Sequence, residues 1–117
     1  MTETKQELLA LAAKAAGYQV VGLADKFLVD PEHRAGGLIV VTPTGGHTAW
    51  NPLDDDGDAL RLAVKLKLQL VTSGETLIQA IQYSSGAYGE CAKGSDPDLA
   101  ARRAIFLAAV EIGRKMP

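Results

Sequence analysis

The sequence predicts an α+β fold in which three helices lie on both faces of a mainly antiparallel sheet of about four strands. Segments with helical periodicity alternate with short β-branched or alternating runs, and glycine, proline or serine separates them. Only 5% of the 117 residues are aromatic although 47% are hydrophobic, so the core must be aliphatic. Small side chains let layers approach closely, which favours helices packed on a sheet. The length and the 22% of charged residues predict a single domain, residues 1–117.

The first half of the chain contains one predicted helix and up to four strand-like segments. Residues 3–16 have helical periodicity with Thr2 or Thr4 as the N-cap, and Gly17 ends the helix, as a left-handed glycine often does. The predicted strands are 18–23, 38–42 and 47–50, with a hairpin turn at 43–46 and a polar connection at 24–37 that contains a partial strand at 27–29.

Residues 50–68 hold the only tryptophan, a cluster of four aspartates and a helix start. One N-cap register uses Asn51, with Pro52 at the first helical position, and a second register caps at Asp55 or Asp56. In the second register the helix begins near Gly57. The apolar arc of this helix is wide and consists of Ala59, Leu60, Leu62, Ala63, Val64 and Leu66. A helix of this pattern should be covered on most of its circumference.

The rest of the chain predicts two more strands and the last helix. Residues 68–71 and 76–83 are predicted strands. In the second of them the side chains alternate between two faces, as they do in an antiparallel strand. Residues 84–93 are rich in glycine and serine and are predicted to be a loop. Asp96 followed by Pro97 begins the last helix. Its inward side is predicted to hold Ala101, Ile105, Phe106, Ala108, Ala109 and Ile112.

The composition argues against several functional classes. A formal charge of −2 gives no strong nucleic-acid signature. No apolar run approaches the roughly 20 residues that span a bilayer. The single cysteine, Cys91, fits a reducing compartment, and the polar N-terminal residues lack the pattern of a signal peptide. We therefore expect a cytoplasmic protein without membrane contact.

The aspartate cluster, residues 54–58, has the Asp-x-Asp-Gly pattern found in the middle of a calcium-binding EF-hand loop. The register fails, because Pro52 would occupy the first ligand position and Ala63 the last. We therefore assign these carboxylates to helix capping and solvation, and we expect no metal and no cofactor.

A hydrolase is the least favoured function. It would use His47 as the base, Asp55 or Asp58 as the orienting carboxylate, and Ser73, Ser84 or Ser85 as the nucleophile. No Gly-x-Ser-x-Gly elbow is present, and the glycine pairs at 36–37 and 45–46 belong to no phosphate-binding motif.

Eight residues are candidates for contact with a ligand or a partner: Trp50, Asp55, Asp56, Asp58, Arg61, Tyr88, Arg102 and Arg103. A guanidinium holds a phosphate or carboxylate by two contacts. Arg102 and Arg103 therefore either bind a ligand or pair with the aspartate cluster, and we favour the pairing. Trp50 is expected to anchor the core, where its indole N–H needs a partner.

Two segments resemble a known family. They are Trp50-Asn51-Pro52-Leu53 followed by residues 55–66, and residues 98–105 followed by Glu111-Ile112-Gly113. These segments are similar to the phage α-β-α sandwich domain family, small and largely uncharacterised proteins of bacteriophages and prophages. The resemblance implies a three-layer α-β-α sandwich, expression inside a bacterial host and no catalytic activity. Asp54 and the segment 88–94 depart from the family pattern.

We therefore expect a non-enzymatic phage or prophage accessory protein of the host cytoplasm. It would bind a host or phage protein, or a second copy of itself. The alternative is a small-ligand binder, such as a nucleotide-sequestering protein that counters a host defence, with Arg102 or Arg103 acting beside Tyr88. An enzyme built on His47 and the aspartate cluster ranks below both.

Overall fold

The computed structural model describes residues 4–23, 37–41 and 44–117. Along these residues the elements are α1 (Lys5–Ala16), β1 (Val20–Leu23), β2 (Leu38–Val41), β3 (His47–Trp50), α2 (Asp56–Lys65), β4 (Gln69–Val71), β5 (Leu77–Gln82), β6 (Ala87–Ala92) and α3 (Pro97–Lys115). The partial strand predicted at 27–29 lies outside the described residues.

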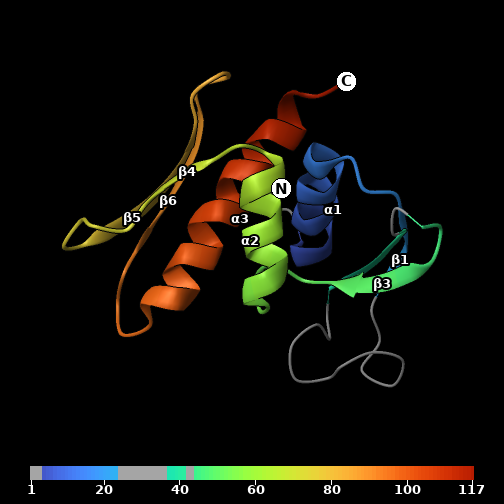
Figure 1. The fold of residues 1–117 in the computed structure, drawn as a ribbon, viewed down its shortest axis with the longest axis horizontal. Helices are drawn as coiled ribbons and strands as arrows, with labels where there is room; N and C mark the ends of the chain where they lie inside the picture. Colours follow the sequence, from blue (N-terminus) through green and yellow to red (C-terminus); the bar gives the residue numbers. More distant parts are fainter. Residues whose placement is uncertain (1–3, 24–36, 42–43) are drawn as a thin grey trace.

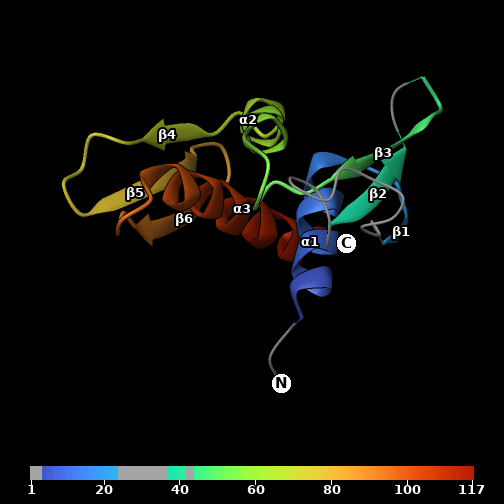
Figure 2. The same ribbon diagram turned by 90° about the horizontal axis from the view of Figure 1, so that it is seen from below.

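The helices occupy the middle of the molecule and the strands form two separate sheets, one on each side (Figure 1). Seen at right angles, the order is the β4-β5-β6 sheet, then α3 with α2 beside it, then α1, then the β1-β2-β3 sheet (Figure 2). Each sheet therefore packs one face against a helix: α3 contacts β5 and β6, and α1 contacts β1 and β2.

The first sheet, β1-β2-β3, is antiparallel throughout. Leu38 pairs with Trp50 and Val41 with His47, while the register of β1 shifts between Val20 and Gly22. Leu38 and Val40 are buried and Ile39 is half-buried, as expected where side chains alternate between the two faces of a strand. β3 ends at Trp50, and from there the chain passes through α2 to the second sheet.

The second sheet, β4-β5-β6, is also antiparallel. Ile78 and Ala80 of β5 and Ala87 and Gly89 of β6 are buried, which places them on the face that packs against α3. A Cβ added at Gly89 would lie 2.4 Å from the carbonyl oxygen of Ala104, so only glycine lets α3 approach this closely. The opposite face of the sheet carries Leu77, Gln79 and Ile81 of β5 and Tyr88, Glu90 and Ala92 of β6, and we call it the outer face.

The helix ends follow from local capping chemistry. Thr4 caps α1 by accepting a hydrogen bond from the Glu7 amide, and Gly17 ends that helix with a φ of 76°. Asp96 caps α3 by accepting from the Leu99 amide, with Pro97 in the first turn. These predicted boundaries are confirmed to within one or two residues.

The core is made of α1 and α3 packed through small residues. Ala12, Ala13, Ala104, Ala108 and Ala109 are all buried here, as the alanine-rich composition predicts. No described helix is long and apolar enough to cross a bilayer.

The predicted α+β class, the layered packing of helices on sheets, the three helices and the antiparallel pairing are confirmed for the described residues. The strand number is not: six strands form two sheets of three, in place of about four strands in one sheet. As a result the helices lie between the sheets. Local sequence patterns identify strands but do not determine which strands pair, and α2 carries the chain from one sheet to the other.

Two further predictions are wrong. The predicted loop at 84–93 contains strand β6, because Gly89 serves the close contact with α3 and the turn is confined to residues 83–86. The prediction that α2 is covered on most of its circumference also fails, since Leu60 and Val64 are 63% and 69% exposed.

The close contact between α1 and α3 predicts the effect of adding one methyl group. A Cβ at Gly113 would lie 2.1 Å from the carbonyl oxygen of Leu11, so Gly113→Ala must push the two helices apart. We expect a loss of about 1–3 kcal/mol in the free energy of unfolding, measured with urea. Gly22→Ala in β1 is the control, because nothing lies within 4 Å of the Cβ that it would add. A neutral or stabilising Gly113→Ala would contradict the packing.

Candidate functional site

The aspartate cluster lies at the corner where β3 passes into α2. The helix uses the second predicted register: Asp55 is the N-cap and accepts a hydrogen bond of 2.8 Å from the Asp58 amide. Asn51 instead organises the preceding turn, where its Oδ1 accepts from the Leu53 amide at 3.2 Å and its backbone oxygen accepts from the Asp55 amide at 2.9 Å. The register that caps α2 at Asn51 is therefore wrong.

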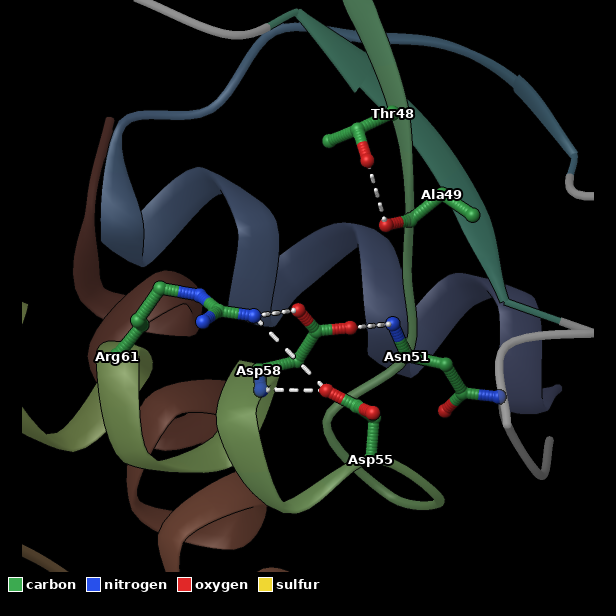
Figure 3. A network of polar contacts seen from close by, with 6 residues as sticks. All are labelled: Thr48, Ala49, Asn51, Asp55, Asp58 and Arg61. Atoms are coloured by element: carbon green, nitrogen blue, oxygen red, sulfur yellow. Dashed lines mark hydrogen bonds and ion pairs between the residues drawn. The ribbon is translucent and has the colours of Figure 1, made fainter. Parts of the chain in front are cut away.

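Asp58 ties the start of α2 back to the end of β3 (Figure 3). Its Oδ2 accepts a hydrogen bond of 2.9 Å from the Asn51 amide, and its Oδ1 accepts one of 2.7 Å from the Arg61 guanidinium. The Asp58 side chain is only 4% exposed, so its charge needs these partners. The hydrogen bond to Asp58 raises the pKa of Arg61 above its ordinary value. The arrangement is a structural tie between a strand and a helix.

Arg102 of α3 holds the same corner from the other side. Its Nε donates a 2.8 Å hydrogen bond to the carbonyl oxygen of Leu53, and its NH1 donates a 2.5 Å hydrogen bond to Asp56. The Arg102 side chain is 16% exposed. Arg102 therefore pairs with the aspartate cluster, which is the alternative favoured from the sequence. Arg103 does not join it; its exposed side chain lies at a different hollow.

The carboxylates of the cluster thus have structural partners. Asp54 accepts a hydrogen bond of 3.1 Å from the Asn51 side chain and lies 3.9 Å from the Lys5 ammonium group. Within the described part of the chain, no group of three or more His, Cys, Asp or Glu residues has an arrangement that could hold a metal ion. The cluster is a set of caps and ion pairs at one corner.

Trp50 is buried next to this corner, as predicted. Its ring meets Tyr18 edge-on at 5.5 Å between centroids, and the Lys65 ammonium lies 5.2 Å from the centre of the Tyr18 ring. Burial raises the pKa of Tyr18, and Asp58 adds to the rise while Arg61 opposes it. The indole N–H of Trp50 has no hydrogen-bond partner in the described part of the structure, contrary to the expectation that it finds one.

The proposed hydrolase residues do not meet. His47 lies in the β1-β2-β3 sheet, whereas Ser73, Ser84 and Ser85 lie in the turns that connect β4, β5 and β6, across the helical layer. Asp58 is engaged at the corner described above. The described residues therefore contain no assembled set of the kind that the hydrolase hypothesis requires.

The residues proposed for nucleotide binding are also separated. Tyr88 is 46% exposed and alternates with Gly89, which faces α3, so its ring lies on the outer face of the sheet. Arg102 and Arg103 are on α3, which packs on the inner face. Tyr88 therefore cannot share a site with either arginine without crossing the sheet.

The structure brings apolar residues together on two surfaces, of which the sequence analysis names only Tyr88 as a contact residue. The first is the outer face of the β4-β5-β6 sheet, where Leu77 and Tyr88 are exposed and Ile81 is half-buried. The second is on α2 and consists of Leu60 and Val64. The signal was present in both cases: β5 is apolar on both of its faces, and the apolar arc of α2 is wider than one packing surface can cover.

Removing the carboxylate that ties α2 to β3 should destabilise the fold. Asp58→Ala leaves the buried amide of Asn51 without this acceptor, and we expect a loss of about 1–3 kcal/mol in the free energy of unfolding. Arg61→Ala should cost less than about 1 kcal/mol, because the Arg61 side chain is mostly exposed. Urea unfolding of both variants measures the difference, and equal effects would mean that the tie to Asn51 contributes nothing.

The neighbouring arginines of α3 form a matched pair for a second measurement. Arg102→Ala removes the hydrogen bonds to Leu53 and Asp56, so the free energy of unfolding should fall by about 1–2 kcal/mol. Arg103→Ala should change it by less than about 0.5 kcal/mol, because the side chain is exposed. If thermal unfolding without ligand does not distinguish the two variants, Arg102 is not a structural brace.

No protein-family model, no curated protein and no solved structure matches this chain. The resemblance to the phage family therefore remains a proposal. Function has to be inferred from the surfaces that the described residues present.

Proposed function

We propose that the protein is a non-enzymatic accessory protein of a bacteriophage or prophage that acts in the host cytoplasm by binding another protein. The phage origin rests on the resemblance of residues 50–66 and 98–113 to the phage α-β-α sandwich domain family. The binding function rests on the outer face of the β4-β5-β6 sheet.

The outer face carries apolar side chains among Gln69, Gln79 and Glu90 although no described element covers it (Figure 2). In the antiparallel register Ile81 lies opposite Tyr88, and Leu77 lies opposite Ala92. Leu77 and Tyr88 are exposed, and Ile81 is half-buried. A sheet whose two faces are both apolar normally has a layer on each face. The missing layer is supplied, in this proposal, by a partner protein.

The polar groups of this face are placed to orient that partner. Gln79 lies opposite Glu90 between the two apolar pairs. The interaction of the Tyr88 hydroxyl with the neighbouring Glu90 carboxylate raises the pKa of Tyr88. An aromatic ring with a polar end beside a carboxylate is typical of protein interfaces, where tyrosine is enriched.

A small-ligand binder remains the second candidate, because Arg103 has a hollow beside it. The hollow measures about 220 Å³ and lies between the end of β6 and the first turns of α3. Lys93 and Arg103 supply two positive charges there, while Asp96 caps the helix. A nucleotide-induced rise in the melting temperature that disappears in Arg103→Ala would favour this candidate over protein binding.

Capture experiments with variants of the outer face test the preferred function. The immobilised protein should retain a specific bacterial or phage protein, identified by mass spectrometry, and Tyr88→Lys combined with Leu77→Lys should reduce that retention at least tenfold. Val21→Lys in β1 is the control, because Val21 is exposed to the same degree as Tyr88 but lies in the other sheet. Retention that is equal for both variants would exclude the outer face as the binding surface.

A further inference from the structure

The side of α2 that faces away from the core carries an apolar stripe. Leu60 and Val64 are one turn apart and are 63% and 69% exposed. The opposite side of α2 is fully packed, with Ala59, Leu62 and Ala63 buried. In Figure 2 α2 is seen down its axis, and no described element lies over its outward side. The stripe is therefore a surface separate from the outer face of the sheet.

A hollow of about 230 Å³ opens directly beside this stripe, between α2, β4 and α3. Its apolar lining includes Leu60, Leu70, Ala101 and Ile105. An exposed aliphatic side chain next to an apolar hollow is the arrangement from which helices pack by inserting side chains into gaps on a neighbour. A second helix packed on α2 would contact the protruding side chains of Leu60 and Val64 and could place a side chain in the neighbouring hollow.

The charges along α2 indicate which helix fits. Asp56 and Asp98 are exposed where α2 begins, and the Asp56 side chain is 77% exposed although its Oδ1 accepts a hydrogen bond from Arg102. Lys67 is exposed just beyond the end of α2. A partner helix should therefore be basic where α2 begins and acidic where α2 ends. The helix α2 itself meets this requirement when it is turned end for end.

We propose that α2 packs antiparallel against α2 of a second copy of this chain, about a twofold axis near the level of residue 62. Leu60 of each copy then contacts Val64 of the other. With a rise of about 1.5 Å per residue, Asp56 lies about 9 Å before the axis and Lys65, the last residue of α2, about 4.5 Å after it. Lys67 follows two residues beyond the helix, on the side of the axis where Asp56 of the other copy lies. Opposed helix dipoles add to the attraction.

The positive charge nearest the stripe does not oppose this contact. Arg61 lies to one side of Leu60 and Val64. In a twofold pair it approaches Arg61 of the other chain. Its guanidinium is bound to Asp58 at 2.7 Å and lies 3.9 Å from Asp55, so its charge is already compensated within each chain. The same guanidinium lies over Gly57, where an added Cβ would meet it at 3.2 Å, so the apolar contact is confined to Leu60 and Val64.

The size of the contact sets its strength. A ten-residue helix is about 15 Å long, so the contact is smaller than the roughly 800 Å² per partner of a standard interface. We therefore expect a reversible dimer with a dissociation constant on the order of 10–100 µM. The dimer leaves the outer face of each sheet free, so this inference goes beyond the proposed binding function and does not depend on it.

Sedimentation equilibrium between about 5 and 500 µM tests the dimer. The average mass should rise from that of one chain, 12.3 kDa, toward twice that value. Leu60→Lys should abolish the rise, because Leu60 is exposed and its replacement leaves the fold intact, as circular dichroism can verify. Tyr83→Lys, at a similarly exposed residue in the β5–β6 turn, should leave the rise unchanged. A constant mass of one chain, or a rise that survives Leu60→Lys, overturns the proposal.

Cross-linking tests the antiparallel direction. In a Cys91→Ser background, Leu60→Cys and Val64→Cys chains are mixed in equal amounts and oxidised by air with a copper catalyst. An antiparallel pair should give mainly the mixed 60–64 disulfide, because these positions face each other. Mainly 60–60 and 64–64 products would mean a parallel pair and would overturn the proposed geometry. If the chain stays monomeric but Leu60→Lys abolishes capture of another protein, the stripe serves that protein and self-association is excluded.

Discussion

The structure depends on the hydrogen bonds through which Asp58 joins the first turn of α2 to the end of β3. The buried Asn51 amide directly follows β3, and it donates a hydrogen bond of 2.9 Å to the Asp58 carboxylate. The same carboxylate is held by Arg61 at 2.7 Å, and Arg102 fixes the intervening turn from α3. This corner sets the direction in which α2 leaves the first sheet. The strands that follow α2 form the second sheet on the far side of the helices.

A layer of helices between two small sheets has a consequence for function. Each sheet can be covered by helices on one face only, and α2, which lies beside the α1–α3 pair, is covered on one side only. Apolar residues nevertheless occur on the uncovered surfaces, at Leu60 and Val64 of α2 and at Leu77 and Tyr88 of the outer face. The carboxylates and Arg102, which look more like a site in the sequence, are occupied in holding the corner. The binding function proposed above therefore rests on exposed apolar surface.

The sequence predicts the parts of this fold that depend on neighbours along the chain. Thr4, Gly17 and Asp96 determine helix ends because capping is completed within about four residues. The sequence also favours the pairing of Arg102 with the aspartate cluster. It leaves open the choice between Asn51 and Asp55 as the N-cap of α2. That choice depends on Asp58 finding the Asn51 amide, which requires the turn to be formed already.

What the sequence alone determined is the inventory: three helices, most of the strands, an alanine-rich core and the residues of the capped corner. Only the tertiary structure decided that the strands divide into two sheets, that Gly89 lies in a strand under α3, and that Leu60 and Val64 stay exposed. Periodicity records that a residue is apolar, but not which surface covers it. Whether an apolar side chain is buried depends on contacts with segments that are distant along the chain. These contacts are determined by how the helices pack.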